Sequence, residues 1–484
     1  MYEQAFKNID NALYKDAGCD SELDYIEQTS WILFLKYLDD YETDKEVAAR
    51  LNGERFTRII EGDFQWRRWA CPVKTDGSLD HRSAMTGDDL KEFVQERLFP
   101  YLASFKQSVE DPHTLQYKIG EVYSQLKNKI DTGYTIRDVL NQVDQLKFLS
   151  NEDRHELSGL YEDKIKNMGN AGRNGGQYYT PRPLIQAIVE IINPQLGETV
   201  YDGAVGSAGF LCEAYEWMRN SKELTALEYE VLQKETFIGK EKKSLAYVIG
   251  TMNMILHGIE APNIIRTNTL SENLADIQQK DRVDVVLANP PFGAAEISEI
   301  ETNFPIKTGE TAYLFVQHFV KIMKVGGRCG VVIKNTFLSA VDNASIALRK
   351  QLLEETNLFA ILDLPNTPFT GTGVKTVVLF FEKGKPTESI HYYQLDPNLK
   401  FGKKTPLKKE HLLDFVDAVK HGQPNQNSWI VNTSEIDSTH WDLTVRNPNR
   451  IEVVDNRTPK EIIAEIEELD AQAAEALQAI KELL

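Results

Sequence analysis

The sequence has little cysteine and lacks any long apolar run. Its four cysteines, Cys19, Cys71, Cys212 and Cys329, lie far apart in the chain and form no CxxC pair. This pattern disfavours a disulfide framework and a thiolate metal site. The first residues, MYEQAFKNID, show no basic segment followed by an apolar core, which a secretory signal would have. No apolar run approaches the roughly 20 residues that span a bilayer. We therefore expect a cytoplasmic protein with no membrane partner and no bound metal.

Basic residues are also in the minority. The chain has 54 Lys and Arg against 73 Asp and Glu, a formal net charge of −19. A protein that binds nucleic acid tightly by itself usually carries a basic face. Any contact with nucleic acid must therefore be local or shared with another subunit. One lysine cluster could contact phosphate or could be a solvated loop, and the sequence leaves both readings open: Lys400, Lys403, Lys404, Lys408 and Lys409.

Periodicity and composition divide the chain into four parts. Residues 1–167 carry apolar side chains at helical spacing and no good strand run, which predicts a helical N-terminal domain. A segment rich in glycine and proline, 168–183, marks its end, and strand-like and helix-like runs alternate up to residue 384. Residues 385–455 form a mixed extension, and 456–484 a C-terminal helix.

The alternating region, 168–384, predicts an α/β fold of the Rossmann-like kind, with a doubly wound and mainly parallel sheet. The strand candidates are TVYD, TFIG, NIIRT, VDVVLA, RCGVVI, FAILDL and TVVLFFE. Only PNTPFTGTGVK separates the last two candidates. Because this segment is too short for a helix, we expect these two strands to pair antiparallel.

The stretch VDVVLANPPFGAAE, residues 283–296, ends a core strand in an unusual corner. Pro290 and Pro291 fix the backbone and remove two N–H donors, so the corner presents acceptors, the Asn289 side-chain oxygen and the Pro290 carbonyl. Two convergent acceptors suit an exocyclic amino group, and Phe292 offers a face on which a base can stack. Acceptors held on such a nitrogen would stabilise the positive charge that develops as it attacks a methyl donor. A target base would first have to leave the duplex stack.

Other strand ends in the same region also carry polar or small residues. Asp202 ends one strand, and three glycines open the next helix: Gly203, Gly206 and Gly209. Their spacing is not that of a dinucleotide site, and the turn could cradle a ligand or only pack a helix on a strand. Glu241 could bind ribose hydroxyls or be a surface glutamate. Asn268 could contact an adenine edge or cap a turn.

Six motifs occur in order along the chain. They are GQYYTPRPL (176–184), DGAVGSAGFL (202–211), GKEKKSLAYVIGTMNMILHGI (239–259), NTL (268–270), NPPFG (289–293) and LDLPNTPFTGTGVKTVVLFFEK (362–383). As a set they resemble the modification subunit of type I restriction–modification systems, an N6-adenine DNA methyltransferase family. The resemblance implies a class I methyltransferase domain, S-adenosylmethionine as cofactor and double-stranded DNA as substrate.

The resemblance also assigns roles to matching positions. Catalysis would fall to Asn289, Pro290, Pro291 and Phe292. The cofactor would be bound by Gln177, Tyr178, Tyr179, Thr180, Pro181, Asp202, Gly203, Ala204, Gly206, Ser207, Ala208, Gly209, Glu241, Asn268, Thr269 and Asn289. One position departs from the family pattern, because Gly203 stands where such loops usually read Asp-Pro-Ala. We expect this change to soften the turn and to affect cofactor affinity.

The order of the motifs bears on partners. Only about 70 residues follow the catalytic region before the tail, which is small for a domain that reads DNA through the major groove. A separate specificity subunit therefore fits, with two copies of this chain for each, and a restriction subunit is a further candidate partner. The tail begins with Thr458, Pro459 and Glu461, a helix-capping pattern, and continues with a heptad seam of apolar residues. This helix could pack on its own domain or dock onto a partner.

Two other functions remain open at this point. Asn-Pro-Pro-aromatic also suits methylation of another amide or amine, such as a protein glutamine. The chain could also bind cofactor only to stabilise a complex, although the intact Asn289 and Phe292 argue against a silent scaffold.

Overall fold

The computed structural model describes residues 2–74, 76, 78–80, 82–147, 157–165, 179–293, 295–365, 374–402, 405–449 and 458–483. Of the predicted cofactor residues, Gln177 and Tyr178 lie outside these ranges, as do Lys403 and Lys404 of the lysine cluster. The chain separates into one unit of residues 1–445 and a second of residues 446–484.

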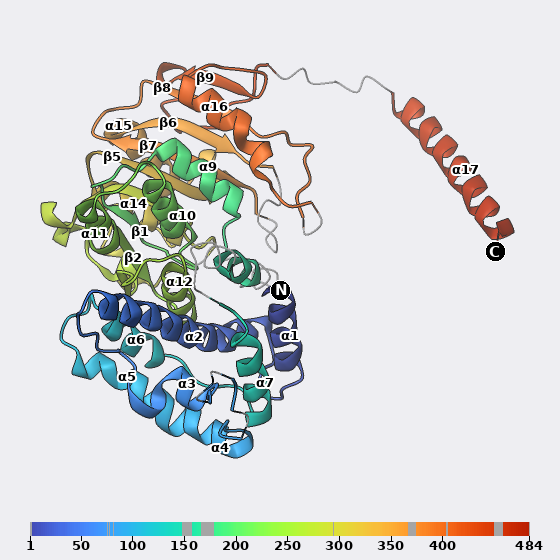
Figure 1. Ribbon diagram of the computed structural model, residues 1–484. Coiled ribbons are helices and arrows are strands. Elements are labelled where there is room, and N and C mark those ends of the chain that lie inside the picture. Colours follow the sequence, from blue (N-terminus) through green and yellow to red (C-terminus); the bar gives the residue numbers. More distant parts are fainter. Residues whose placement is uncertain are drawn as a thin grey trace. The chain divides into compact units, whose positions relative to one another are not determined.

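The N-terminal region is helical, as predicted, and its helices gather together in Figure 1. A long central helix begins at Ser21, whose side chain accepts a hydrogen bond from the Asp24 N–H, and it is buried throughout from Tyr25 to Asp40. Trp66 and Trp69 are buried in the core rather than exposed as a binding platform. The elements are α1 Tyr2–Tyr14, α2 Glu22–Leu51, η1 Gly62–Phe64, α3 Trp66–Trp69, α4 Gly87–Glu92, η2 Phe93–Leu98, α5 Phe99–Ser108, α6 Leu115–Tyr123 and α7 Gly133–Val143, and residues 157–165 are also helical.

A single sheet organises the rest of the first unit, in the order β3-β2-β1-β4-β5-β7-β6-β8-β9. The first five of these strands are parallel, and β7 runs antiparallel to both β5 and β6. The predicted mainly parallel sheet, with its antiparallel last pair, is therefore confirmed. The strands are β1 Val200–Asp202, β2 Phe237–Glu241, β3 Ile264–Arg266, β4 Val283–Ala288, β5 Met323–Lys334, β6 Thr356–Asp363, β7 Thr376–Lys383, β8 Ser389–Gln394 and β9 Ser428–Asn432.

Helices cover both faces of the sheet, which makes it doubly wound (Figure 1). Alternate residues of β4 point to opposite faces and join two different cores. Val285 and Leu287 pack in one core with α9, α10, α12 and α16, and Val286 packs in the other with α14 and α15. The helical elements here are α9 Arg182–Ile192, α10 Gly209–Arg219, α11 Ala226–Lys234, α12 Ser244–Leu256, η4 Thr269–Ser271, η5 Leu274–Asp276, η6 Gln279–Asp281, α13 Ser298–Glu301, α14 Thr311–Ile322, η7 Asn335–Leu338, α15 Asn343–Glu355, η8 Lys409–Leu412, α16 Leu413–His421 and η9 Thr433–Glu435.

The segment after residue 384 continues the same sheet. β8 pairs parallel with β6, and β9 pairs antiparallel with β8. The Tyr392 and Trp429 rings stack across this pair with centroids 5.5 Å apart. This part of the predicted mixed extension therefore forms one edge of the same sheet.

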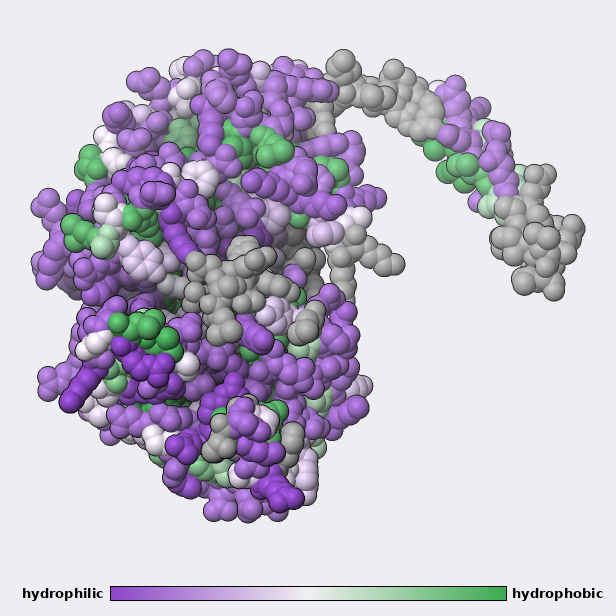
Figure 2. All heavy atoms as spheres, viewed as in Figure 1, coloured by the Kyte–Doolittle hydropathy of each residue, from purple (hydrophilic) through white to green (hydrophobic). Residues whose placement is uncertain are grey.

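The second unit contains the helix α17, Pro459–Leu483. The predicted cap is present, because the Thr458 hydroxyl accepts from the Glu461 N–H at 3.3 Å and the Glu461 carboxylate accepts from the Thr458 N–H at 2.6 Å. Figure 2 shows hydrophobic residues on its surface, and Ile466 and Leu469 are more than half exposed, at 52% and 56%. Within the described ranges, no helix is both long and apolar enough to cross a membrane.

Candidate active site

The predicted site residues meet because neighbouring parallel strands end at the same edge of the sheet. β1 lies between β2 and β4, with Asp202 beside Gly239 and Tyr201 beside Val286. The turn after β1, the end of β2 and the corner after β4 therefore share the carboxyl edge, where open α/β sheets bind ligands. This topology brings together motifs that lie far apart in the sequence.

The turn that follows β1, residues 202–209, is called the glycine turn below. Asp202 is buried, and its carboxylate accepts the Ala204 N–H at 2.9 Å. Glu241, at the end of β2, accepts the N–H groups of Gly206 at 2.9 Å and Lys243 at 2.8 Å. Burial raises the pKa of Asp202 to about 8 and also raises the pKa of Glu241, although these hydrogen bonds oppose the shift.

Side chains from two further segments hold the glycine turn. The Thr269 hydroxyl donates to the Gly203 carbonyl at 2.6 Å, and the Asn253 amide donates to the Ser207 carbonyl at 2.9 Å. A Cβ at position 203 would lie 3.0 Å from a ring carbon of Phe319, so the turn leaves little room for a larger residue there. The turn thus lacks the proline of the family pattern but has several fixed contacts in its place.

The backbone of the glycine turn is tightly bent. Gly206 and Ala208 both have positive φ, 53° and 63°, and Ala208 precedes the first residue of α10. Asn268 is half-buried, and its side chain accepts the Leu270 N–H at 3.2 Å. Of the two roles open to Asn268, turn capping is therefore present in the structure.

The segment Asn289–Phe292 is called the proline corner below. Asn289 is half-buried, and its Nδ2 donates to the Thr180 hydroxyl at 3.0 Å. Its Oδ1 is buried and has no hydrogen-bond partner among the residues that the structure describes. Pro290 is buried, and Pro291 and Phe292 are half-buried. Phe292 packs against the margin of the core, so part of its ring surface remains accessible.

A pair of charged residues supports the far end of the proline corner. Gly293 turns the chain with a φ of 68°, and its N–H donates to the Glu310 carboxylate at 3.3 Å. Lys334, the last residue of β5, holds the other oxygen of Glu310 at 3.1 Å. Strand β5 and the start of α14 therefore fix the point at which the chain leaves the corner.

The segment 179–182 reaches the same edge from the N-terminal side. Arg182, the first residue of α9, pairs with Glu162 at 2.6 Å and with Glu213 at 2.8 Å. A small cavity joins this segment to the glycine turn, and its lining includes Tyr179, Thr180, Ser207 and Gly209. Of the predicted cofactor residues, the structure thus brings Tyr179 and Thr180 beside the glycine turn.

Several residues at this edge were missed by sequence reasoning. Asn253 had a usable signal, because it is a polar residue inside the apolar helical run SLAYVIGTMNMIL. The ion pairs of Arg182 and the contact between Thr180 and Asn289 join distant parts of the chain, and no local sequence pattern predicts them.

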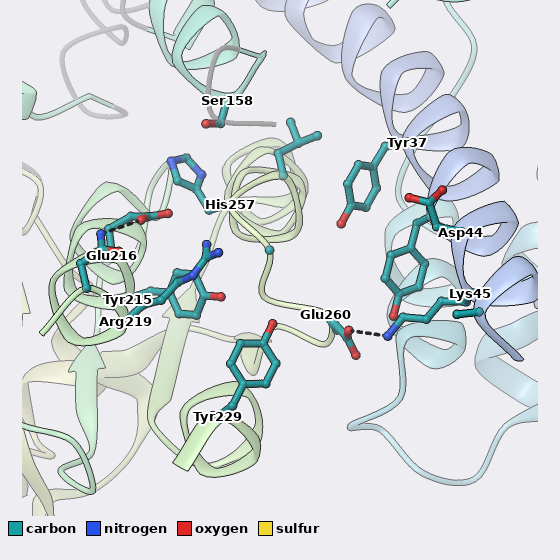
Figure 3. Close-up of a pocket in the computed structure, with 15 residues that line it drawn as sticks. Tyr37, Asp44, Lys45, Ser158, Tyr215, Glu216, Arg219, Tyr229, His257 and Glu260 are labelled. Atoms are coloured by element: carbon teal, nitrogen blue, oxygen red, sulfur yellow. Dashed lines mark hydrogen bonds and ion pairs between the residues drawn. The ribbon is translucent and has the colours of Figure 1, made fainter. Parts of the chain in front are cut away.

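A larger cavity of about 520 Å³ lies elsewhere, between α2 and the ends of α10 and α12. Figure 3 shows tyrosines from both sides facing it, with Lys45 of α2 paired to Glu260 at 3.4 Å. None of the predicted catalytic or cofactor residues lines it. This cavity lies where the helical region meets the α/β region, away from the edge of the sheet that carries the predicted site residues.

The strand order, the antiparallel β7 and the helices on both faces define the class I methyltransferase fold. Comparison with known proteins narrows this class. Residues 152–456 match the N-6 DNA methylase family, and residues 5–170 match the HsdM N-terminal domain. The chain belongs to the family of type I restriction enzyme methylase subunits and is an adenine-specific N6 DNA methyltransferase. The family resemblance predicted from the motifs is confirmed.

Individual relatives match over nearly the whole chain. The type I restriction enzyme EcoEI methylase subunit of Escherichia coli is 32% identical over 492 aligned residues, covering 99% of this chain and 96% of that one. A modification subunit of a type I restriction enzyme from Vibrio vulnificus YJ016 has a TM-score of 0.82 at 34% identity, covering 94% and 98%. A chain from a structure on assembly and conformational transition of the type I system has a TM-score of 0.78 at 35% identity, covering 99% and 97%.

Proposed function

We propose that this chain transfers a methyl group from S-adenosylmethionine to the N6 amino group of an adenine extruded from double-stranded DNA. The observation that carries the proposal is Asn289 Oδ1, which is buried and without a partner among the described residues. A buried acceptor in this state is costly unless a ligand donates to it. The amino group of an extruded adenine is such a donor, and it would lie beside the glycine turn.

The residues around the glycine turn fit the proposed cofactor. Each oxygen of Glu241 accepts one backbone N–H, and a carboxylate oxygen can accept a second hydrogen bond, here from a ribose hydroxyl. Asp202, the backbone of 203–209, and Asn268 with Thr269 would hold the rest of the molecule, and Tyr179 and Pro181 would close one side. When bound, S-adenosylmethionine supplies an electrophilic methyl group.

The proline corner would then prepare the target nitrogen. The amino nitrogen of adenine is a poor nucleophile because its lone pair is delocalised into the ring. Asn289 Oδ1 and the Pro290 carbonyl would accept its two N–H groups, favour a more tetrahedral nitrogen, and stabilise the positive charge that develops. Phe292 would stack on the ring, and the two prolines would keep this geometry fixed before the reaction begins.

The proposal includes a complex with other subunits, acting in the cytoplasm. A separate specificity subunit would read the DNA sequence, with two copies of this chain for each, and a restriction subunit would be a further partner. The net charge of −19 supports shared rather than independent DNA binding. The exposed apolar residues of α17 support a docking role for that helix.

The test compares Asn289→Ala with the wild type in the complex with the specificity subunit. Labelled S-adenosylmethionine and DNA from cells that lack the system serve as substrates. We expect methyl transfer to DNA to fall by about 10²–10³-fold, since one stabilising contact to developing charge is lost. Cofactor affinity, measured by calorimetry, should change little. The exposed Asn220→Ala is the matched control. Transfer at the wild-type rate by Asn289→Ala, or label found on protein instead of DNA, would contradict the proposal.

A further inference from the structure

The amide of Asn289 has two ends of similar size and opposite polarity. Its oxygen accepts hydrogen bonds, whereas its NH₂ group donates them. Only the oxygen can serve an amino group, because two donors facing one another repel. Pro290 and Pro291 have no N–H groups, so the backbone of these two residues offers no donor that would occupy the amide oxygen. An acceptor that binds the NH₂ end would keep the oxygen directed at the target.

Thr180 is that partner in this structure. The two residues lie 109 positions apart, and the Asn289 Nδ2 donates to the Thr180 hydroxyl at 3.0 Å. The contact engages the donor end of the amide and leaves Oδ1 as the end with no partner among the described residues. Donation by Nδ2 also polarises the amide, which makes its oxygen a better acceptor.

The residues that follow Thr180 hold its backbone in place. Pro181 follows it with a φ of −54° and is buried, and α9 begins at the next residue. There Arg182 is anchored by carboxylates from two different segments, Glu162 of the helix 157–165 and Glu213 of α10. A proline and a residue held by two ion pairs therefore follow Thr180 directly in the chain and fix its backbone.

From these contacts we propose that Thr180 is a positioning residue for methyl transfer, which sets the orientation of the Asn289 amide. The inference rests on the proposed function of Asn289. It changes the role expected for Thr180 from the sequence, where this residue was assigned to the cofactor. The Thr180 hydroxyl acts through Asn289, so loss of the hydroxyl lowers the reaction rate and weakens binding of the target amino group.

The test uses three variants in the complex with the specificity subunit. Thr180→Val has nearly the same shape but no hydroxyl, and Thr180→Ser restores the hydroxyl. We expect Thr180→Val to lower kcat about tenfold, the value of one ordinary hydrogen bond, with cofactor affinity within about twofold of wild type. Thr180→Ser should retain most of the activity. Adding Thr180→Val to Asn289→Ala should produce no further loss, because both changes remove the same interaction.

A second readout measures binding alone. DNA with purine in place of the target adenine lacks the amino group, which removes the proposed contact with Asn289 and also makes the base easier to extrude. The ratio of the affinities of the wild-type complex for adenine DNA and purine DNA is therefore the reference. Thr180→Val should shift this ratio towards purine DNA, and Thr180→Ser should leave it unchanged. A merely structural role for Thr180 would weaken binding to both DNA molecules equally.

The outcomes separate the two claims. If Asn289→Ala is inactive and Thr180→Val matches the wild type, the role of Thr180 is overturned and the proposed function stands. If Thr180→Val weakens cofactor binding as much as it lowers kcat, Thr180 belongs to the cofactor site and the inference also fails. If Asn289→Ala is fully active, the proposed function itself is wrong.

Discussion

The glycine turn and the proline corner lie at the ends of neighbouring strands, but they are built in opposite ways. The glycine turn has a flexible sequence, and its polar groups have partners within the protein, as the Gly206 N–H has in Glu241 and the Ala204 N–H has in Asp202. The proline corner has a stiff sequence, and it leaves the Asn289 oxygen without a partner among the described residues.

This difference matches the two tasks proposed for the site. A turn that holds a cofactor has to keep its shape before the ligand arrives, so internal hydrogen bonds are useful. A corner that stabilises developing charge has to keep an acceptor available, and rigid backbone then replaces hydrogen bonds as the source of order. We therefore expect changes in the glycine turn to affect cofactor affinity and changes in the corner to affect rate.

The largest effect expected in the glycine turn comes from Glu241→Ala. The change leaves two backbone N–H groups without their acceptor and removes the proposed ribose contact. We expect cofactor affinity to fall by about 100-fold, as measured by calorimetric titration. Glu235→Ala, at an exposed glutamate that precedes β2, should leave affinity unchanged. Equal affinities for wild type and Glu241→Ala would remove Glu241 from the cofactor site.

Gly203→Ala tests whether the absent proline was replaced by packing. The added Cβ would lie 3.0 Å from a ring carbon of Phe319 and 3.1 Å from the Tyr201 hydroxyl. We expect the free energy of unfolding to fall by about 1–3 kcal/mol in urea titrations. Gly159→Ala is the control, because a Cβ there meets no atom within 4 Å. A Gly203→Ala protein as stable as the wild type would show that the turn has spare room.

His318 tests the layer beneath the glycine turn. It is buried, hydrogen-bonded to the Tyr201 hydroxyl at 3.0 Å, and burial lowers its pKa from 6.5 to about 3. Below pH 6.5 the unfolded chain therefore takes up a proton that the folded chain resists, so this histidine makes stability fall as pH drops from about 6.5 towards 3. We expect the melting temperature of His318→Gln to fall less between pH 7 and pH 5 than the melting temperature of the wild type. Parallel curves for the two proteins would exclude this contribution.

The smallest expected effect concerns the support of the proline corner. Glu310→Gln keeps an acceptor for the Gly293 N–H but loses the ion pair with Lys334, which is partly exposed and therefore modest in strength. We expect a few-fold lower methylation rate, a larger loss for Glu310→Ala, and unchanged cofactor affinity in both. Glu299→Gln, at an exposed glutamate of α13, is the control. A change in cofactor affinity with an unchanged methylation rate would contradict the separate roles of the glycine turn and the proline corner.

Much of this arrangement could be predicted from local sequence. Five of the six motifs lie at or just after the end of a strand, so the parallel sheet, the shared edge and the antiparallel β7 follow from periodicity and connection lengths. The capping pattern at Thr458 and Glu461 is also local, and it is present as predicted. These features depend on residues only a few positions apart, which is why a single sequence reveals them.

The remaining features depend on residues brought together by the fold. The pairing of β8 with β6, the contact of Thr180 with Asn289 and the contact of Tyr201 with His318 each join segments that are distant in sequence. No periodicity signals such contacts. The role of Asn268 was open for a different reason, because turn capping and adenine contact are both made by the same residue type.

In the proposed reaction, the Asn289 oxygen accepts a hydrogen bond from the amino group of an extruded adenine. A structure of this chain assembled with its specificity subunit, a non-reactive cofactor analogue and target DNA would test this contact. We expect Asn289 Oδ1 to lie about 3 Å from N6 of the extruded adenine, with Nδ2 still donating to Thr180. An adenine extruded into a different pocket, with Asn289 Oδ1 bonded to the protein or to the cofactor, would contradict it.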